Sequence, residues 1–378
     1  MATQELTDRR PDRSEPGGTE YVETLIIGGG QAGLASAYHL AKRGRPCLVL
    51  DAAERVGDSW RQRWPSLRLY SPARYDRLPD MRFPAPPNSF PSANEMGDYL
   101  EAYAKRFDLP IRNRVTVDGL SRDGDRYVVT AGDSRFEADN VIVATGVMQT
   151  PTIPSFAADL DPAIRQLHSQ DYRSPTQLQA GPTLVVGAAH SGADIAIEVS
   201  GTNHVLLAGR DTGQIPFPLE SRRMRIAFPV LKFLATRVLT LNTPIGRKLQ
   251  PEIRAHGGPL LRVKSSHLEA AGVERTFERV VGAVRGMPAL ESGRVLEVSN
   301  VIWCTGFRND FDWIRLPVIG DDGYPEQRRG VVAASPGLYF VGLLFLHSFS
   351  SMLVLGTGRD TGYVVKHIAS QRKDRRSS

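Results

Sequence analysis

One stretch of the chain, residues 24–51, combines a short apolar run, a glycine-rich turn, a helical pattern and a second apolar run. The β-branched, apolar run Thr24–Ile27 is typical of a buried parallel strand. It leads directly into Gly28-Gly29-Gly30-Gln31-Ala32-Gly33, a G-x-G-x-x-G turn. Apolar residues then recur at helical spacing, and the strand-like run Pro46–Leu50 ends at Asp51. This order of elements predicts a dinucleotide-binding βαβ unit.

Several positions in this unit have a physical role. Gly28 allows the tight turn, Gly30 lets the backbone approach a pyrophosphate, and Gly33 lets helix and strand pack closely. The pyrophosphate lies at the N-terminus of the helix, on free N–H groups and the positive end of the helix dipole. Asp51 is placed to accept a hydrogen bond from a ribose hydroxyl.

The same order of elements recurs about 160 residues downstream, so the chain contains an internal repeat. The strand-like run Thr183–Val186 leads into Gly187-Ala188-Ala189-His190-Ser191-Gly192, followed by a helical pattern and the run Val205–Ala208. Ala189 replaces the middle glycine. The repeat predicts either two nucleotide sites or one site and a decayed copy.

The residues after the second strand of each unit distinguish the two sites. Arg210 follows the second unit where the first has Asp51. An acid there favours a free ribose hydroxyl, and an arginine accommodates a 2′-phosphate. The first site therefore suits FAD and the second NADPH, although Arg210 could also be an ordinary solvated arginine.

The repeat predicts an α/β fold with two Rossmann-like, three-layer dinucleotide-binding domains built on parallel sheets, the NADP domain being inserted into the FAD domain. Three short alternating segments in 115–137 predict an antiparallel meander in the FAD domain. A basic helical insert at 221–250 contains Pro229, which would break or kink it. The insert either covers the active site or contacts a membrane surface. The expected divisions are a disordered tail 1–20, FAD domain 21–150, linker 151–182, NADP domain 183–300, FAD-domain return 301–370 and basic tail 371–378.

Composition excludes several other classes of protein. The 378 residues carry a formal net charge of +6, which suits an anionic cofactor. Much of the excess basic charge lies in short stretches rather than on one aromatic-interleaved face, which argues against nucleic-acid binding. Cys47 and Cys304 form no C-x-x-C, so a dithiol redox enzyme is not expected. No metal cluster and no signal peptide are recognisable, and the apolar stretch 338–355 contains polar residues that favour a loop over a lipid span. We expect a cytoplasmic protein without a transmembrane anchor.

Together these motifs resemble the flavin-containing monooxygenases, specifically the small bacterial members near the plant indole-pyruvate monooxygenases. Besides the two turns, the resemblance rests on Gly57-Asp58-Ser59-Trp60, Ala144-Thr145-Gly146, Ser191–Ala196, Thr305-Gly306-Phe307 and Pro336–Gly342. It implies that Ser59, Trp60 and Gly342 line the flavin, and that Ser191 and Arg210 hold NADP. The full set of expected cofactor-binding residues is Gly28, Gly30, Gln31, Gly33, Asp51, Ser59, Trp60, Val115, Gly146, Gly187, His190, Ser191, Gly192, Arg210 and Gly342.

The chain departs from this family at several positions. The family's linker signature, F-x-G-x-x-x-H-x-x-x-Y, is matched only in its second half, by His168 and Tyr172. Tyr172 in place of a tryptophan points away from the related Baeyer–Villiger enzymes, and His190 stands where the family usually has asparagine. His168 is a candidate for a catalytic role or for a linker histidine that orients the two domains. His347 is a further candidate near the expected flavin.

The resemblance implies a reaction in which NADPH reduces FAD, reduced FAD meets O2, and a flavin C4a-(hydro)peroxide transfers one oxygen atom to a small organic substrate. Soft N or S nucleophiles, ketones and 2-oxo acids all fit as substrates. The alternatives are a Baeyer–Villiger-type monooxygenase, an NADPH oxidase or reductase without oxygen transfer, and a non-catalytic flavin-binding module. A homodimer is possible.

Overall fold

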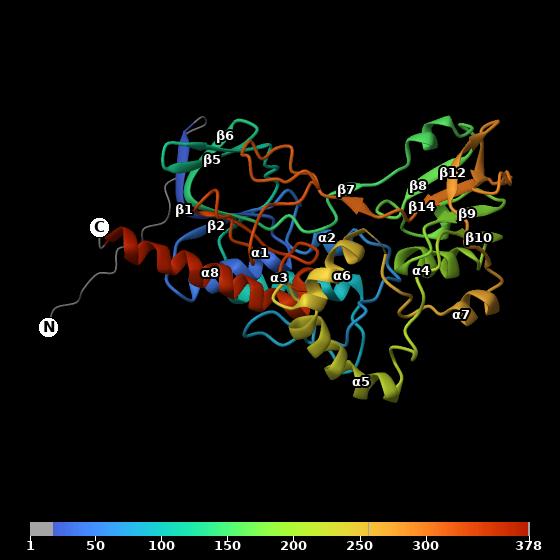
Figure 1. Cartoon of the computed structure of the whole chain (residues 1–378), viewed down its shortest axis with the longest axis horizontal. Coiled ribbons are helices and arrows are strands. Elements are labelled where there is room, and N and C mark those ends of the chain that lie inside the picture. Colours follow the sequence, from blue (N-terminus) through green and yellow to red (C-terminus); the bar gives the residue numbers. More distant parts are fainter. Residues whose placement is uncertain (1–17, 256, 377–378) are drawn as a thin grey trace.

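Two α/β domains lie side by side along the long axis of the molecule, each built around its own sheet (Figure 1). The computed structural model describes residues 18–255 and 257–376. Two connections join the domains, and their strands β7 (Thr150–Pro151) and β15 (Phe307–Arg308) pair with each other in antiparallel fashion. The chain leaves the first domain at β7 and returns to it at β15. The predicted α/β class, with one dinucleotide-type domain inserted into the other, is confirmed.

The first sheet has seven strands in the order β3-β2-β1-β6-β5-β4, with β16 also paired to β6. Its long strand β6 pairs in antiparallel fashion with β5 along its first half and in parallel with β16 along its second half. A parallel layer and the predicted meander therefore share one strand. The members are β1 (Thr19–Ile27), β2 (Cys47–Leu50), β3 (Ile111–Arg112), β4 (Gly119–Asp123), β5 (Arg126–Ala131), β6 (Ser134–Val143) and β16 (Leu338–Phe340).

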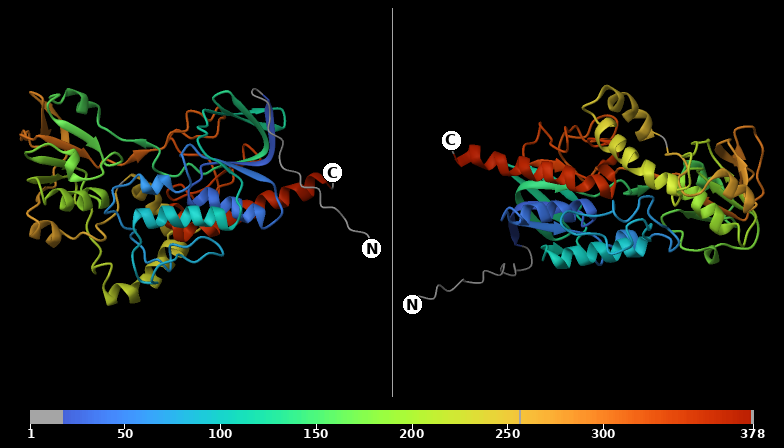
Figure 2. Two further views of the ribbon diagram at one scale, coloured as in Figure 1. Left: turned by 180° about the vertical axis from the view of Figure 1, so that it is seen from behind. Right: turned by 90° about the horizontal axis from the view of Figure 1, so that it is seen from below.

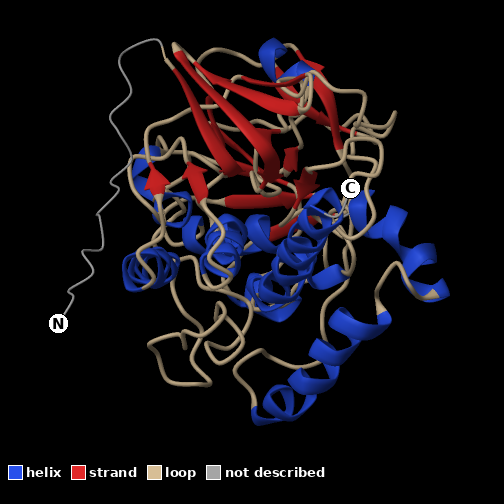
Figure 3. Ribbon diagram, turned by 90° about the vertical axis from the view of Figure 1, so that its left-hand side faces the viewer, coloured by secondary structure: helices blue, strands red, loops and turns tan. Residues whose placement is uncertain are grey.

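Three helices cover one face of this sheet: α1 (Gln31–Ala41), α3 (Ala93–Arg106) and α8 (Val354–Arg376). Figure 2 shows α1 between the other two, and Figure 3 shows the strands above this helical layer. The start of α3 is fixed by a capping box, in which the Ser92 hydroxyl accepts from the Glu95 N–H and the Glu95 carboxylate accepts from the Ser92 N–H. Fully buried apolar side chains such as Ile26 and Leu34 fill the space between sheet and helices.

The second sheet has five parallel strands in the order β11-β10-β9-β14-β8. Helix α4 (His190–Val199) packs against one face with α7 (Ser265–Ala270), and the hairpin β12–β13 packs against the other with η1 (Ser155–Asp159). A short 3-10 turn, η2 (Pro175–Gln177), precedes β9. The strands are β8 (Arg165–His168), β9 (Thr183–Val186), β10 (Val205–Ala208), β11 (Glu274–Thr276), β12 (Val280–Val284), β13 (Met287–Leu290) and β14 (Asn300–Trp303).

The pairing of the second sheet corrects two expected boundaries. Strand β8 lies within the segment predicted as a linker, yet it pairs with β14 as an edge strand. Strand β14, expected to begin the return to the first domain, lies between β9 and β8 inside the second sheet. The second domain therefore extends from β8 to β14. Its edge strand has only one apolar residue, Leu167, which is why its sequence gives no strand signal.

The insert consists of α5 (Arg222–Phe233), the π-helical turn η3 (Leu234–Val238) and α6 (Pro244–Ala255). Pro229 does not break α5, which continues to Phe233. Figure 2 shows the insert reaching from the second domain to α8 of the first. The rings of Phe228 and Tyr75 stack with centroids 4.7 Å apart and so attach α5 to the first domain. Ile226 and Val230 lie on the exposed side of α5.

The ends of the chain differ partly from expectation. The predicted tail 1–20 lies outside the described residues except at its end, where β1 begins at Thr19, and of the predicted basic tail 371–378 the described residues up to Arg376 belong to α8. The meander begins at Gly119 rather than at Val115.

The apolar stretch 338–355 forms β16, the 3-10 turn η4 (Phe349–Met352) and the start of α8. Across the described residues, no helix is long and apolar enough to cross a membrane.

Candidate dinucleotide sites

The first glycine turn has the geometry that a dinucleotide requires. Gly28 has a φ of +109°, and a Cβ there would lie 2.6 Å from the Ala144 carbonyl oxygen. A Cβ at Gly33 would overlap the Gly28 carbonyl, whereas a Cβ at Gly30 would meet nothing within 4 Å. Gly28 and Gly33 are therefore required by the turn itself. The space beside Gly30 remains open for a ligand.

A pocket of about 450 Å³ opens beside this turn and brings together four of the predicted residues, Gly28, Asp51, Ser59 and Val115. The Asp51 carboxylate accepts hydrogen bonds from the Gly29 and Ala53 N–H groups, which hold it at the edge of the pocket. The Val115 N–H donates to the Asp51 carbonyl (3.0 Å), and for this reason Val115 belongs to the pocket rather than to the meander.

The other predicted residues of the first site gather at the N-terminus of α1. The Trp60 indole N–H, on α2 (Asp58–Arg61), donates to the Gln31 side-chain oxygen at 3.4 Å. A Cβ at Gly342 would lie 2.9 Å from the Ala32 Cβ, so the chain after β16 passes directly over the same helix end. Gly146 has a φ of +74° and follows β6, where its carbonyl accepts from the Gln149 amide.

These residues fit FAD. No side chain caps α1 and no acidic residue lies in its first turn, so its free N–H groups and positive dipole end face the open space beside Gly30. Asp51 is at the end of β2, where a ribose would lie. FAD supplies the electron-transfer and oxygen chemistry when it is bound. The chain supplies a cradle for the pyrophosphate and an acceptor for the ribose.

The second turn has the same backbone geometry as the first at its key positions. The Gly187 N–H donates to the Ala208 carbonyl at 2.8 Å, as the Gly28 N–H does to the Leu50 carbonyl at 2.8 Å. Gly187 also has a φ of +109°, and a Cβ there would overlap the Cys304 carbonyl. A Cβ at Gly192 would overlap the Gly187 carbonyl. Both units therefore retain working turn geometry, in spite of the alanine at position 189.

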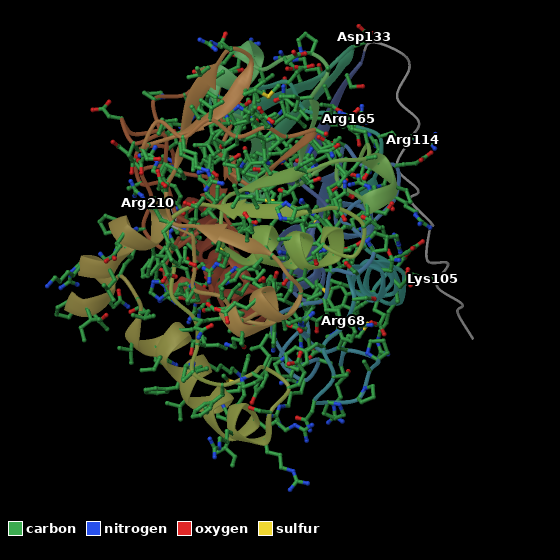
Figure 4. The ribbon with its side chains drawn as sticks, turned by 90° about the vertical axis from the view of Figure 1, so that its right-hand side faces the viewer. Arg68, Lys105, Arg114, Asp133, Arg165 and Arg210 are labelled. Atoms are coloured by element: carbon green, nitrogen blue, oxygen red, sulfur yellow. The ribbon has the colours of Figure 1, made fainter. Side chains whose placement is uncertain are left out.

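The register of the second sheet shows which residue matches Asp51. Strand β10 ends at Ala208, so the position equivalent to Asp51 is Gly209, and Arg210 is the next residue. A Cβ at Gly209 would lie 2.9 Å from the Ala188 nitrogen, which favours glycine there. Arg210 is exposed at the surface of the second domain, well apart from Arg165, as Figure 4 shows. The absence of an acid at position 209 and the cation beside it suit a 2′-phosphate.

The His190 side chain is engaged by the segment that borders the second turn. Its Nε2 lies within hydrogen-bonding distance of the Pro259 carbonyl, so Nε2 carries the proton and donates. Burial lowers the pKa of His190, which keeps the ring neutral. A Cβ at Gly257 would lie 2.8 Å from the Ala189 Cβ, so the segment 257–259 borders the second turn. Ser191 and Gly192 lie in the first turn of α4, which has no side-chain cap and no acidic residue there.

His168 has both ring nitrogens engaged. Its Nδ1 accepts from the Gln170 N–H at 3.1 Å, so its Nε2 donates to the Gly306 carbonyl, also at 3.1 Å. The side chain is 2% exposed, and burial lowers the pKa of the ring. Because β8 carries His168 and Gly306 immediately precedes β15, the bond ties the second sheet to the interdomain connection. This geometry favours the linker role over the catalytic one.

Side chains of the first domain fix α4 in place. The Tyr70 hydroxyl donates to the Asp194 carboxylate at 2.7 Å, and the Ser66 hydroxyl donates to Glu198. Trp64 and Leu67 enter the hydrophobic core of the second domain. The segment that follows α2 therefore attaches α4, the helix after the second turn, to the first domain.

The two cysteines do not form a dithiol redox site. Cys47 is in β2 of the first domain and Cys304 follows β14 of the second, and both are free thiols. Burial raises the pKa of each thiol to about 12. Neither is a thiolate at neutral pH, and no pair exists for dithiol chemistry.

Sequence reasoning missed residues that reach the first pocket from distant segments. Trp313 comes from the returning part of the chain, where its carbonyl accepts from the Leu120 N–H at 2.9 Å. Thr145 and Gln62 also line this pocket. Trp313 lies outside any glycine turn or strand pattern, so only the tertiary fold reveals its position.

Two intact dinucleotide units, one completed by an acid and the other by an arginine, define a two-site flavoprotein oxidoreductase. Residues 25–216 match the family model described as pyridine nucleotide-disulphide oxidoreductase. The chain is 35% identical over 348 residues to an uncharacterised oxidoreductase of Geobacillus kaustophilus, covering 92% of this chain and 98% of that one. It is 27% identical over 386 residues to a probable indole-3-pyruvate monooxygenase of Arabidopsis thaliana, covering 93% and 87%.

A solved flavin-containing monooxygenase from Stenotrophomonas maltophilia has the same overall structure. The TM-score is 0.72 at 25% identity, with 93% of this chain and 99% of that chain covered. The chain therefore belongs to the pyridine nucleotide-disulphide oxidoreductase family and, within it, to the flavin monooxygenases, with FAD and NADPH as cofactors.

Proposed function

We propose that this protein transfers one oxygen atom from O2 to a small organic substrate, with NADPH at the second glycine turn reducing FAD at the first. The observation that carries the proposal is the matched pair of glycine turns, with the helix that follows the second turn bonded to the first domain through Tyr70 and Asp194. Soft N or S nucleophiles, ketones and 2-oxo acids are the candidate substrates.

Each protein group has a defined part in this scheme. The first turn and Asp51 bind FAD, and Arg210 selects NADPH over NADH. His168 orients the domains, while the insert shields the space between them from water. The Cys47 and Cys304 thiols are separated and protonated, which supports oxygen transfer over disulfide reduction. We place this reaction in the cytoplasm.

The test is a substrate screen under ¹⁸O2 with purified, FAD-loaded protein. For a true substrate we expect one labelled oxygen atom in the product for each NADPH oxidised, with little hydrogen peroxide. If NADPH is oxidised and all of its electrons appear as peroxide whatever compound is added, the protein is an NADPH oxidase and the proposal is wrong. The position of the label distinguishes N- or S-oxygenation from insertion into a carbon–carbon bond.

A further inference from the structure

A second pocket, of about 440 Å³, lies where the insert meets the first domain, and neither glycine turn contributes a residue to its lining. The insert contributes Leu241, Asn242 and Arg247, and the first domain contributes Arg328, Arg329 and His347. The two walls are joined by backbone pairing, since the Leu241 N–H donates to the His347 carbonyl at 2.8 Å. The charged side chains that line this pocket are all arginines.

The three guanidinium groups have no acidic partner in the part of the chain that the structure describes. Within residues 18–255 and 257–376, neither Arg247, Arg328 nor Arg329 forms an ion pair, although nearby Arg254 and Arg359 pair with Asp322 and Asp360. Three cations around one pocket repel each other, and an anion bound between them would offset this repulsion. Guanidinium groups also match carboxylate and phosphate oxygens with two parallel hydrogen bonds.

The backbone holds Arg329 in an unusual conformation at this place. Arg328 and Val331 exchange backbone hydrogen bonds of 2.9 and 3.1 Å across a tight turn, in which Arg329 has a φ of +54°. A left-handed conformation costs a non-glycine residue about 1 kcal/mol or more, and such residues cluster at ligand-binding sites. The Arg329 guanidinium also lies 3.9 Å from the centre of the Tyr363 ring, which limits its movement.

His347 provides an independent sign of a missing ligand. The side chain is 5% exposed and lines the pocket, yet its Nδ1 is buried with no hydrogen-bond partner. A buried polar atom without a partner costs about 1–3 kcal/mol, so a ligand that accepts from this nitrogen would be favoured. Burial and the positive charges of Arg329 and Arg359, opposed by Asp360, lower the pKa of His347 to about 4.

We propose that this pocket binds the carboxylate or phosphate group of a small organic anion between Arg247 of the insert and Arg328, Arg329 and His347 of the first domain. The bound anion connects α6 to the first domain and therefore closes the insert over the interior of the molecule. The residues that hold the anion differ from those that line the first dinucleotide site and from those of the second turn, and its binding requires neither NADPH nor O2.

The test is calorimetric titration of the oxidised, FAD-loaded, full-length protein with three probes. Benzoate represents a carboxylate, sulfate represents a phosphate, and benzamide is the neutral analogue of benzoate. We expect one molecule of benzoate or sulfate to bind per chain, with benzamide not binding, and the preferred anion identifies the class of ligand. Saturating NADP+ should leave this binding intact.

The variants Arg247→Ala and Arg328→Ala should each weaken the binding of the preferred anion by roughly tenfold, as expected for a lost charge-assisted hydrogen bond. Lys248→Ala is the matched control, because it removes one positive charge from the same helix at a position outside the pocket. Its effect should be less than about twofold. Retained FAD absorbance and an unchanged melting temperature show that a variant is folded.

The affinity for the anion should rise as the pH falls from 8 to 6. The anion raises the pKa of His347 from its low value in the free protein, so proton uptake accompanies binding. The charged groups that face the ring are Arg247, Arg328, Arg329, Arg359 and Asp360. His347→Gln should remove this pH dependence. No binding of either anion, equal effects of the Arg247 and Lys248 variants, or loss of binding with NADP+ would each overturn the proposal.

Discussion

At the scale of single residues, the two nucleotide sites differ in the charge that follows the second strand of each unit. The first unit ends in Asp51, which is held by two backbone N–H groups, and the second ends in Gly209 followed by Arg210. Among the described residues, Arg210 has no acidic partner, so its guanidinium is available to a phosphate group. We therefore propose that selection between NADPH and NADH depends on this residue.

Replacing Arg210 with alanine should weaken NADPH binding by roughly 10- to 100-fold, because a charge-assisted contact to the 2′-phosphate is lost. NADH binding should change by less than about twofold, since NADH lacks that phosphate. The measurement is the rate of flavin reduction as a function of each cofactor's concentration. Arg165→Ala, an exposed arginine elsewhere on the same domain (Figure 4), is the control. Equal losses for both cofactors would contradict the assignment.

Asp76 is a buried acid whose ionisation lowers the stability of the folded protein. Its side chain is 1% exposed; the Ser71 hydroxyl donates to one carboxylate oxygen, and the other has no partner. Burial raises the pKa of Asp76 from 3.8 to about 7. Because the folded protein holds this proton more tightly than the unfolded chain, stability falls as pH rises from about 4 towards 7 and remains reduced above it.

Asp76→Asn should stabilise the protein at pH 8 and have little effect near pH 4, because asparagine keeps the bond to Ser71 and carries no charge. The gain is at most about 4 kcal/mol, which is the free energy of a shift of about three pKa units. Thermal melting at several pH values measures it. If the variant and the parent protein lose stability in parallel between pH 5 and pH 8, Asp76 does not titrate in this range.

At the scale of elements, the strand–turn–helix units have two kinds of glycine. Gly33 and Gly192 have no room for a Cβ, because the helix passes directly over the turn. Gly30 has open space beside it and is constrained only by the ligand it faces. Ala189 stands at the position that corresponds to Gly30, so the second unit accepts its Cβ and still folds.

The variants Gly30→Ala and Gly33→Ala therefore should fail in different ways. Gly30→Ala should fold with normal far-UV circular dichroism but retain FAD at least about tenfold less tightly, because its methyl group enters the pyrophosphate cradle. Gly33→Ala should lose soluble, folded protein, because its Cβ overlaps a carbonyl oxygen. Equal FAD content in the Gly30 variant and the parent would contradict the location of the cradle.

How much the sequence predicts also depends on the element. Local patterns predict both turns, the helices that follow them and the strands beside them, because each pattern is contained within about 30 residues. Strand β8 and Trp313 depend on partners more than 100 residues away, so no local pattern identifies them. The arginines of the second pocket come from two domains and converge only in three dimensions.

At the scale of the whole molecule, function depends on how the two domains are held together. Polar contacts between them include the β7–β15 pair, the His168–Gly306 bond and the Tyr70–Asp194 bond, and Trp64 and Leu67 add apolar contacts. Asp194 is half-buried, and burial raises its pKa while the Tyr70 hydroxyl lowers it. The Tyr70 hydroxyl therefore helps to keep a charged acid at the interface between the domains.

Tyr70→Phe should weaken this interface by about 1–3 kcal/mol, because Asp194 loses its hydrogen-bond donor. We expect flavin reduction by NADPH to slow several-fold while FAD content stays unchanged. Tyr75→Phe is the control, because its ring can keep the stacking contact with Phe228. Similar reduction rates in the Tyr70 variant and the parent would show that this bond does not set the arrangement of the domains.

The central claim is that the two dinucleotide sites act in sequence, and a two-step stopped-flow experiment tests it most directly. The FAD-loaded protein is mixed first with NADPH without oxygen and then with O2, while the flavin absorbance is recorded. We predict rapid bleaching and then, while NADP+ stays bound, a persistent spectrum that matches neither oxidised nor reduced FAD. Absence of bleaching, or direct return to oxidised FAD with an equivalent of hydrogen peroxide even when substrate is present, would contradict the account.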